Sequence, residues 1–199
     1  MEIQKITDQI SYFPATETPL SADVGVIRCA GELWIFDVGS TEEVAEAVNN
    51  IPGQKNIVLS HFHPDHTGNI GRVSWAHLYA GAFTCRRLGI GTAVDNHLYF
   101  ENSVHIFPLP SSHSKGCEGL EYEDYAFLGD ATYSMKKDGK VAYNAGLLKQ
   151  LIAVLKSLHA NQFLLSHSEP FAHPKAEVVA QLEEIYALRS CHDPYIFLQ

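Results

Sequence analysis

The stretch Ser60-His61-Phe62-His63-Pro64-Asp65-His66-Thr67-Gly68-Asn69 is the most informative part of this sequence. It has the pattern H-x-H-x-D-H and directly follows an apolar segment at residues 57–60. In an extended segment, His61 and His63 project to the same side and can bind one metal ion together. Asp65 and His66, beyond the turn, then face a neighbouring position. Imidazole and carboxylate suit zinc, iron or manganese, so the segment predicts a metal site.

Apolar segments on both sides of this motif predict strands and helices in mixed blocks. Ser40 followed by Glu43 is a capping box that indicates a helix start. The pattern as a whole predicts an α/β or α+β sandwich, with sheet in the middle and helices outside. The expected strands are residues 24–30, 33–36, 57–60, 75–79, 104–107, 120–122, 125–128 and 163–166, and the expected helices are residues 40–49, 82–88, 146–159 and 175–189.

Length and composition restrict the classes of protein to consider. A chain of 199 residues with 46% hydrophobic and 19% charged residues predicts one globular domain over residues 1–199. The net charge of −9 argues against a nucleic-acid partner. No apolar run approaches the roughly 18 residues of a membrane span, and the polar start does not resemble a signal peptide. We therefore expect a cytoplasmic protein with a small-molecule substrate and no membrane partner, and we leave its oligomeric state open.

A metal site needs more ligands than one loop provides, and three further candidates follow predicted strands. His113 lies in the segment Pro110-Ser111-Ser112-His113, Asp130 follows Phe127-Leu128-Gly129, and His167 follows Leu164-Leu165-Ser166. Polar residues at the ends of buried strands are common site residues, because the strands fix their positions. Each candidate is weak alone, but together with the H-x-H-x-D-H segment they favour metal ligation.

This order of motifs resembles the metallo-β-lactamase superfamily, in particular small single-domain dinuclear metallohydrolases of the glyoxalase II-like branch. Phe36-Asp37-Val38-Gly39 is similar to that family's early Asp-x-Gly element. The resemblance covers residues 24–167 and implies an αββα sandwich of two mixed sheets flanked by helices. Asp37 is expected to steady the ligand loop. The implied ligands are His61, His63 and His113 for one metal, Asp65, His66 and His167 for a second, and Asp130 as the bridge between them.

The bridging position bears on the branch of the family. Asp130 resembles the hydrolases that share a carboxylate between two metals, whereas the commonest β-lactamases carry Cys there. The diiron oxygen-reducing branch usually has Glu in place of His63 and an added flavin domain. Glyoxalase-type thioesterases carry a helical C-terminal domain, for which the roughly thirty residues after His167 are too few. The RNA-cleaving members need additional RNA-binding segments.

The resemblance implies hydrolysis with two divalent ions, Zn²⁺ first and Fe or Mn as other suitable metals. Such ions make hydroxide available at neutral pH, and Asp65 is the expected catalytic residue that orients it. Candidate substrate-binding residues are Lys115, Tyr133 and Tyr143. We expect substrate specificity to depend on loops at residues 14–20, 93–102 and 135–143. The substrate could be a small ester, thioester, lactone or phosphodiester.

Two other functions remain open from the sequence. One is a mononuclear iron dioxygenase of the same fold that acts on a persulfide, because such an enzyme uses a similar ligand set. The other is a non-catalytic metal-binding member, against which the complete ligand set argues. Metal content and oxygen consumption distinguish the first of these from a hydrolase.

Overall fold

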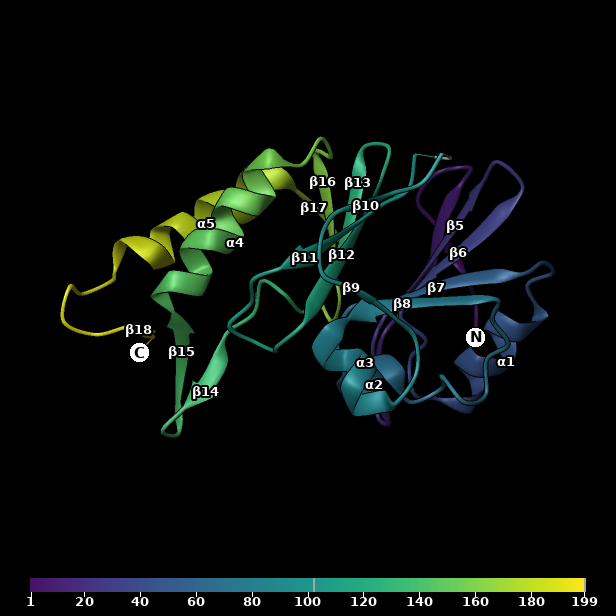
Figure 1. The fold of residues 1–199 in the computed structure, drawn as a ribbon, viewed down its shortest axis with the longest axis horizontal. Coiled ribbons are helices and arrows are strands. Elements are labelled where there is room, and N and C mark those ends of the chain that lie inside the picture. The colour runs from purple at the N-terminus through teal and green to yellow at the C-terminus, as the bar shows by residue number, and fades with distance from the viewer. Residues whose placement is uncertain (102, 199) are drawn as a thin grey trace.

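The computed structural model describes residues 1–101 and 103–198, so that position 102 of the expected loop at residues 93–102 and position 199 of the expected domain lie outside the described residues. Two large sheets form the centre of the molecule (Figure 1). The first has seven strands in the order β1-β2-β5-β6-β7-β8-β9. Their bounds are β1 Gln4–Lys5, β2 Ile10–Phe13, β5 Val24–Cys29, β6 Glu32–Phe36, β7 Lys55–Leu59, β8 His77–Gly81 and β9 Thr92–Val94.

The second sheet has six strands in the order β10-β11-β12-β13-β16-β17. Its strands are β10 Leu98–Tyr99, β11 His105–Leu109, β12 Cys117–Tyr122, β13 Tyr125–Gly129, β16 Gln162–Leu165 and β17 Ala172–Pro174. A small sheet of β14 (Met135–Lys137), β15 (Lys140–Asn144) and β18 (Tyr195–Phe197) and a hairpin of β3 (Thr16–Glu17) and β4 (Leu20–Ser21) complete the strands.

Helices cover the outer faces of both large sheets (Figure 1). The helices are α1 Glu42–Asn50, α2 Pro64–Thr67, α3 Ala82–Leu88, α4 Ala145–Ser157 and α5 Lys175–Ala187. The helices α4 and α5 lie on the far side of the six-stranded sheet, and α1, α2 and α3 lie with the seven-stranded sheet. The four layers are therefore helix, sheet, sheet and helix, and the predicted αββα sandwich is confirmed.

Alternating side chains along the strands produce three hydrophobic cores, one between each pair of layers. In β6, Trp34 and Phe36 point into the core between the sheets, whereas Leu33 and Ile35 pack in the core with α1. This alternation follows from the two-residue period of a strand. In the other sheet, Phe127 faces the core between the sheets and its neighbours face α4 and α5. Both faces of each central strand are thus buried, as their apolar runs predict.

The ends of the central strands meet at one edge of the sandwich. Strands β6 and β7 are parallel, β13 and β16 are parallel, and β11 runs in the same direction as β13 because β12 is antiparallel to both. Strands that run in one direction end at the same edge of their sheet. The residues that follow β6, β7, β11, β13 and β16 are therefore brought to common edges, and they include every ligand predicted from the sequence.

Most predicted elements agree with the structure, but the predicted start of α1, with Ser40 as the capping residue, was wrong. Its N-cap is Thr41, whose hydroxyl accepts a hydrogen bond from the Val44 backbone N–H. The Ser40 hydroxyl instead donates to the Leu20 carbonyl oxygen, so it is not available to cap the helix. Strand β8 also begins two residues later than expected, at His77. The short strands β1 and β14 were not predicted, because they are mainly polar and carry no apolar alternation. Strand β15 was not predicted either, since its two buried residues, Ala142 and Tyr143, are adjacent rather than alternating.

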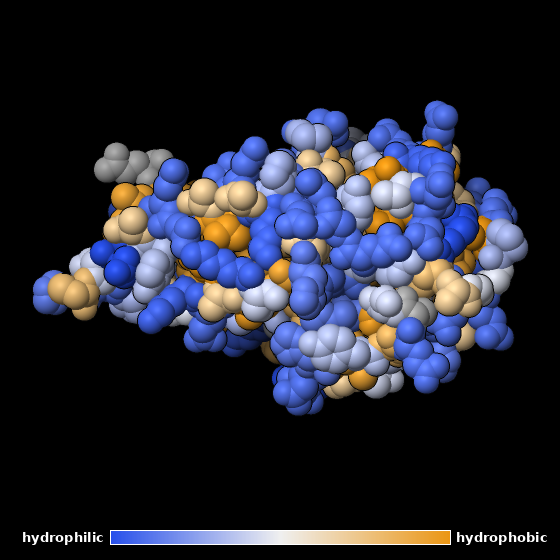
Figure 2. Space-filling view, turned by 90° about the horizontal axis from the view of Figure 1, so that it is seen from above, coloured by the Kyte–Doolittle hydropathy of each residue, from blue (hydrophilic) through white to orange (hydrophobic). Residues whose placement is uncertain are grey.

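The surface is mainly hydrophilic on the face drawn in Figure 2, where hydrophobic side chains appear as separate patches. Among the described residues, no helix has both the length and the apolar character that crossing a bilayer requires.

Candidate metal centre

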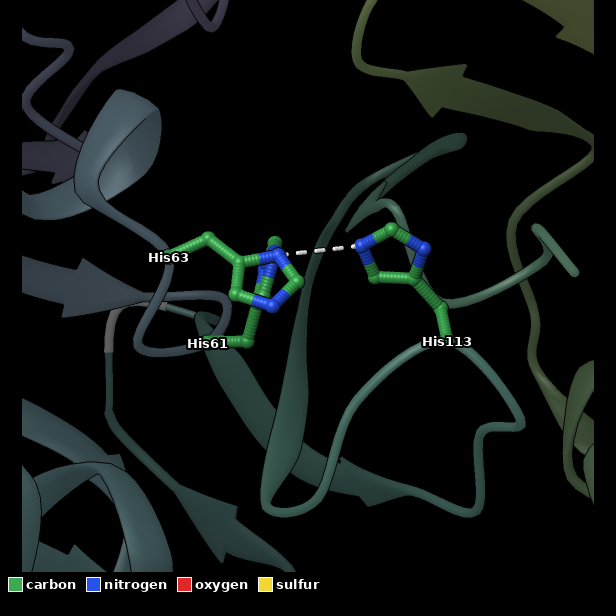
Figure 3. Close-up of side chains that lie close together, drawn as sticks. All are labelled: His61, His63 and His113. Carbon is green, nitrogen blue, oxygen red and sulfur yellow. Dashed lines mark hydrogen bonds between the residues drawn. The ribbon is translucent and has the colours of Figure 1, made fainter. Parts of the chain in front are cut away.

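Three imidazoles form the first cluster of possible metal ligands: His61, His63 and His113, with one donor nitrogen of each lying within 4.8 Å of the others. The nitrogen His61 Nε2 lies 2.8 Å from His63 Nδ1, and His113 Nε2 lies 3.1 Å from the same atom. Figure 3 shows that His113 approaches the other two rings from a different segment of the chain. The loop after β7 and the loop after β11 therefore combine to form this cluster.

The second cluster combines two imidazoles with two carboxylates, and it consists of Asp65, His66, Asp130 and His167. The nitrogen His167 Nε2 lies 3.0 Å from Asp65 Oδ2, and His66 Nε2 lies 3.4 Å from the same oxygen. The His167 backbone has a positive φ of 59° and its N–H donates to Asp23. This unusual backbone conformation turns the ring back towards the loop after β7.

Asp130 lies between the two clusters. Its Oδ2 atom is 3.3 Å from His113 Nε2, in the first cluster, and 3.4 Å from His66 Nε2, in the second. A single carboxylate therefore reaches donors of both groups. This is the position that a bridging ligand would need, and it agrees with the role that the family resemblance implies.

Asp37 and Ser60 hold the ligand loop from below. The Asp37 carboxylate accepts hydrogen bonds from the Ser60 N–H, the Ser60 hydroxyl and His66 Nδ1, each at 2.7 Å. The Ser60 hydroxyl also lies 3.0 Å from His61 Nδ1. Because the Nδ1 atom of His66 is hydrogen-bonded to the Asp37 carboxylate, its Nε2 atom is the nitrogen that remains available to bind a metal ion. The predicted position of Asp37, in contact with the ligand loop, is observed.

Gly129 makes the close approach behind this network possible. A Cβ at this position would lie 2.6 Å from the Ser60 Cβ, and the residue has a positive φ of 53°. Both features favour glycine, because other residues would clash with Ser60 and would be strained in this conformation. Gly129, directly before Asp130, thus lies against the buried Asp37–Ser60 contact.

The two clusters differ in their affinity for protons. Burial and the neighbouring imidazoles lower the pKa of His61 and of His63. Burial also opposes the charge on His66, but the negative charges of Asp37 and Asp130 outweigh it and raise the pKa of His66 to about 10. A hydrogen bond to Asp65 raises the pKa of His167. His61 and His63 therefore offer neutral nitrogen donors, whereas His66 and His167 of the second cluster favour the positively charged form.

Two buried atoms that could bind a metal, the His66 Nε2 nitrogen and the Asp130 Oδ1 oxygen, make no hydrogen bond with the described residues, although His66 Nε2 lies 3.4 Å from one carboxylate oxygen each of Asp65 and Asp130. Leaving such atoms unsatisfied in a protein interior costs about 1–3 kcal/mol each. Both belong to the second cluster, where the carboxylates favour a cation. The donor set, with imidazole nitrogens and carboxylate oxygens, also suits zinc and other divalent ions of the first transition series. The residues present therefore fit divalent metal ions.

A cleft of about 550 Å³ opens above both clusters. Ligands from each group line it, namely His63, Asp65, His113, Asp130 and His167. Residues 14–17 and 20 form another part of its wall, and a role of this loop in substrate specificity stays a prediction. The volume lies in the range of small-molecule sites, which is about 300–1,000 Å³. The metal ligands are therefore accessible to a small molecule.

The three predicted substrate-binding residues have different surroundings. Lys115 is exposed and lines a second cleft beside the first cluster. The Tyr133 hydroxyl donates to the Ser166 carbonyl oxygen, and the Tyr143 hydroxyl donates to the Thr132 carbonyl oxygen. Both tyrosines line a separate, smaller cavity and neither of the two clefts. The geometry thus gives no support to substrate contact by Tyr133 or Tyr143.

Comparison with solved structures identifies the fold. The DIM-1 metallo-beta-lactamase superposes with a TM-score of 0.67 at 15% identity, over 95% of this chain and 98% of that one. A metallo-beta-lactamase superfamily protein from Sulfolobus tokodaii superposes with a TM-score of 0.61 at 16% identity, over 90% of this chain and 87% of that one. The chain has the metallo-β-lactamase fold. The chemotaxis sensor ODP, solved as a peroxy diiron species, gives 0.67 at 14% identity, over 96% of both chains.

The other comparisons do not show which branch of proteins with the metallo-β-lactamase fold this chain resembles most. A scan of family models gave no match, and a search of curated proteins gave no significant match. Similar structures include β-lactamases and a diiron protein, so the expected glyoxalase II-like branch stays a prediction. The diiron chain is covered over 96% of its length. At 14% identity, this likeness shows the fold alone.

Several residues around the site were not identified from the sequence. The carboxylate of Asp23 accepts hydrogen bonds from the backbone N–H groups of Ala15 and His167, and so connects the loop at residues 14–20 to a ligand. Ser60 was assigned only to a strand. A single aspartate or serine carries no spacing signal, and its role depends on contacts between distant segments. Ser60 could have been suspected because it lies directly before His61 at a strand end.

Proposed function

We propose that this protein is a metal-dependent hydrolase that uses two divalent cations to cleave a small ester, thioester, lactone or phosphodiester. One observation carries the proposal: two donor clusters share Asp130 at the base of an open cleft. A purely structural metal site would be closed by protein ligands on all sides, whereas catalytic sites keep an open position. The metallo-β-lactamase fold and the β-lactamases among its similar structures support a hydrolytic reaction.

The two clusters would hold the ions in the arrangement predicted from the sequence. His61, His63 and His113 would bind the first, Asp65, His66 and His167 the second, and Asp130 both. Divalent ions held in this way act as Lewis acids and lower the pKa of water to about 7. Zinc best suits the nitrogen-rich first cluster, and iron or manganese would also suit the carboxylates of the second.

The chain's own residues would orient the reactants. The Asp65 carboxylate lines the cleft and is held by His167, so it can accept a hydrogen bond from an attacking water and aim it at the substrate. Burial raises the pKa of Asp65, but the hydrogen bond from His167 and the charge of His66 together lower it below its ordinary value, so that the carboxylate stays ionised at neutral pH. We therefore propose Asp65 as the catalytic residue that positions the water.

Metal analysis combined with a substrate panel tests the proposal. Purified protein would be loaded with zinc, iron or manganese, its metal content measured by mass spectrometry, and ester, thioester, lactone and phosphodiester chromogens supplied in turn. We expect two ions per chain and turnover that a chelator abolishes and added metal restores. His61→Ala and Asp130→Ala should abolish turnover, whereas His77→Ala, an exposed histidine outside both clusters, should not.

Other results would identify the competing functions. One iron per chain, with oxygen consumed in the presence of a persulfide, would overturn hydrolysis in favour of the dioxygenase. Unchanged activity in both His61→Ala and Asp130→Ala, with circular dichroism that confirms folding, would show that the observed turnover does not come from this centre. Metal binding without turnover of any substrate class would favour the non-catalytic member.

A further inference from the structure

A second cleft, of about 420 Å³, adjoins the first cluster on the side of His63 and His113. Both of these residues line the two clefts, whereas Asp65, Asp130 and His167 line only the first. A molecule bound over the metal ligands can therefore extend in two directions. The second cleft also contains large apolar side chains from separate elements, each partly exposed: Phe62, Phe83, Met135, Leu147 and Tyr195.

The two clefts differ in their charged residues, although apolar residues such as Pro14, Ala15 and Leu20 also line the first. Of the described residues that line the first cleft, Glu17, Asp23 and Glu169 are carboxylates that belong to neither cluster, and none is lysine or arginine. Of those that line the second, none is a carboxylate and Lys115 is the basic one. The remaining wall is apolar or carries uncharged serine and asparagine groups. An apolar group would thus be placed in the second cleft rather than in the first.

The apolar wall of the second cleft is held in place by its neighbours. The rings of Phe62 and Phe83 meet edge to face, with 5.3 Å between their centroids, and the Arg87 guanidinium lies 5.2 Å from the Phe62 ring centre. Across the cleft, the Asn144 side chain accepts from the Leu147 N–H, and the Asn144 N–H donates to Ser112. The start of α4 is thereby fixed to the loop that carries His113. A preformed cleft binds its ligand with little loss of conformational entropy.

We propose that the second cleft binds the apolar acyl group of the substrate, so that the enzyme cleaves an ester or thioester of an apolar carboxylic acid. This inference rests on the proposed hydrolase function. Water would form a bond to the carbonyl carbon while the bond from that carbon to the ester oxygen or thioester sulfur breaks. One proton of the water passes to the leaving alcohol or thiol, and the acid is released. The leaving group would lie in the first cleft.

A series of acyl chain lengths tests this inference. Metal-loaded enzyme would be assayed with acetyl, butyryl, hexanoyl and octanoyl esters and thioesters of one chromogenic leaving group. Each buried methylene stabilises a bound chain enough to raise kcat/KM by up to about fourfold. We expect kcat/KM to rise along the series until the chain fills the cleft. Turnover of any member tests the hydrolase proposal, and the dependence on chain length tests the inference.

Substitution of Leu147 locates the effect. Leu147→Trp places a larger side chain in the second cleft and should reduce the ratio of hexanoyl to acetyl kcat/KM towards one. Leu188→Trp makes the same change at a position that is 67% exposed and lines neither cleft, and should leave that ratio and the activity unchanged. A flat series in the unmodified enzyme, or an undiminished ratio in Leu147→Trp, would overturn the inference.

If no acyl substrate is turned over, binding of the product acids tests whether the second cleft holds an acyl group. Calorimetry of the metal-loaded protein should then show tighter binding of hexanoate than of acetate, and Leu147→Trp should remove the difference. Equal binding of the two acids, or the same difference in Leu147→Trp, would exclude an acyl site in this cleft. In that case hydrolysis of a lactone or phosphodiester would still support the proposed function.

Discussion

The first donor cluster consists of three imidazoles, whereas the second combines two imidazoles with two carboxylates. Burial lowers the pKa of His61 and His63 in the first, while nearby carboxylates outweigh burial and raise the pKa of His66 in the second. The second cleft adjoins only the first cluster. One loop after β7 thus supplies ligands to two sites with different chemistry. The difference indicates that the clusters bind metal with different strength and pH dependence, connected by Asp130.

Removal of Asp130 should have the largest effect, because its carboxylate contacts both clusters. We expect Asp130→Ala to lower kcat on the order of 10³-fold, comparable to the loss of a key electrostatic group. It should also lower the affinity for both ions. His167→Ala, which removes a ligand of the second cluster only, should lower the affinity for one ion. Metal content at increasing chelator concentration would distinguish the two. If Asp130→Ala lowers the affinity for only one ion, as His167→Ala does, Asp130 does not bridge the two metal sites.

Substitution of Asp37 should weaken the second cluster more than the first. Asp37→Asn removes the charge that holds His66 Nδ1, and the loss of such a contact typically lowers metal affinity about 10–100-fold. The first cluster should change less, since its contact with Asp37 passes through the Ser60 hydroxyl. Competition with a fluorescent chelator would measure both affinities. Asp8→Asn, an exposed aspartate paired with Lys5, is the matched control. An equal loss of affinity for both ions would contradict this prediction.

Metal binding should release more protons from the second cluster than from the first. With its pKa raised to about 10, His66 is protonated at pH 7 in the metal-free protein, and the raised pKa of His167 favours its protonated form, so that metal binding must displace protons from this cluster. The lowered pKa values of His61 and His63 mean that those imidazoles are already neutral. The affinity of the second cluster should therefore rise with pH by about tenfold per pH unit for each proton released. Calorimetry in buffers of different ionisation enthalpy measures this number, and equal proton release from both steps would refute the difference.

The candidate donors could be selected from the sequence because their signal is local. His61, His63, Asp65 and His66 lie within six residues, directly after the buried strand that becomes β7. The apolar runs that became β6, β13 and β16 were recognisable for the same reason, since strands buried on both faces are apolar throughout. The αββα layers followed from the resemblance that these motifs carry, rather than from the periodicity of the segments.

The clefts could not be predicted, because their walls come from segments far apart in the chain. Phe83 lies in α3, Leu147 in α4 and Tyr195 in β18, and no spacing in the sequence connects them. The surroundings of Tyr133 and Tyr143 could not be predicted for a related reason. Their hydroxyls are taken by backbone carbonyls, and the partners of a hydroxyl depend on tertiary contacts. Candidate metal ligands could thus be selected from local order in the sequence, whereas the clefts beside them became visible only in the folded structure.

Lys115 should have the smallest effect, and one that depends on the charge of the substrate. It is exposed at the second cleft, where an ion pair with a bound carboxylate is worth about 0.2–1 kcal/mol, or up to about fivefold in kcat/KM. Lys115→Met should reduce kcat/KM for an acyl group that ends in a carboxylate, but not for a neutral acyl group of equal length. Lys115→Arg should retain the preference for an acyl group that ends in a carboxylate, and Lys149→Met, at an exposed position on α4, should not alter it.

Because an exposed ion pair is screened by salt, this preference should decrease as ionic strength rises. A loss of the same size for the charged and the neutral acyl groups would show that the Lys115 side chain contributes packing rather than charge, and that this cleft does not select acyl groups by their charge.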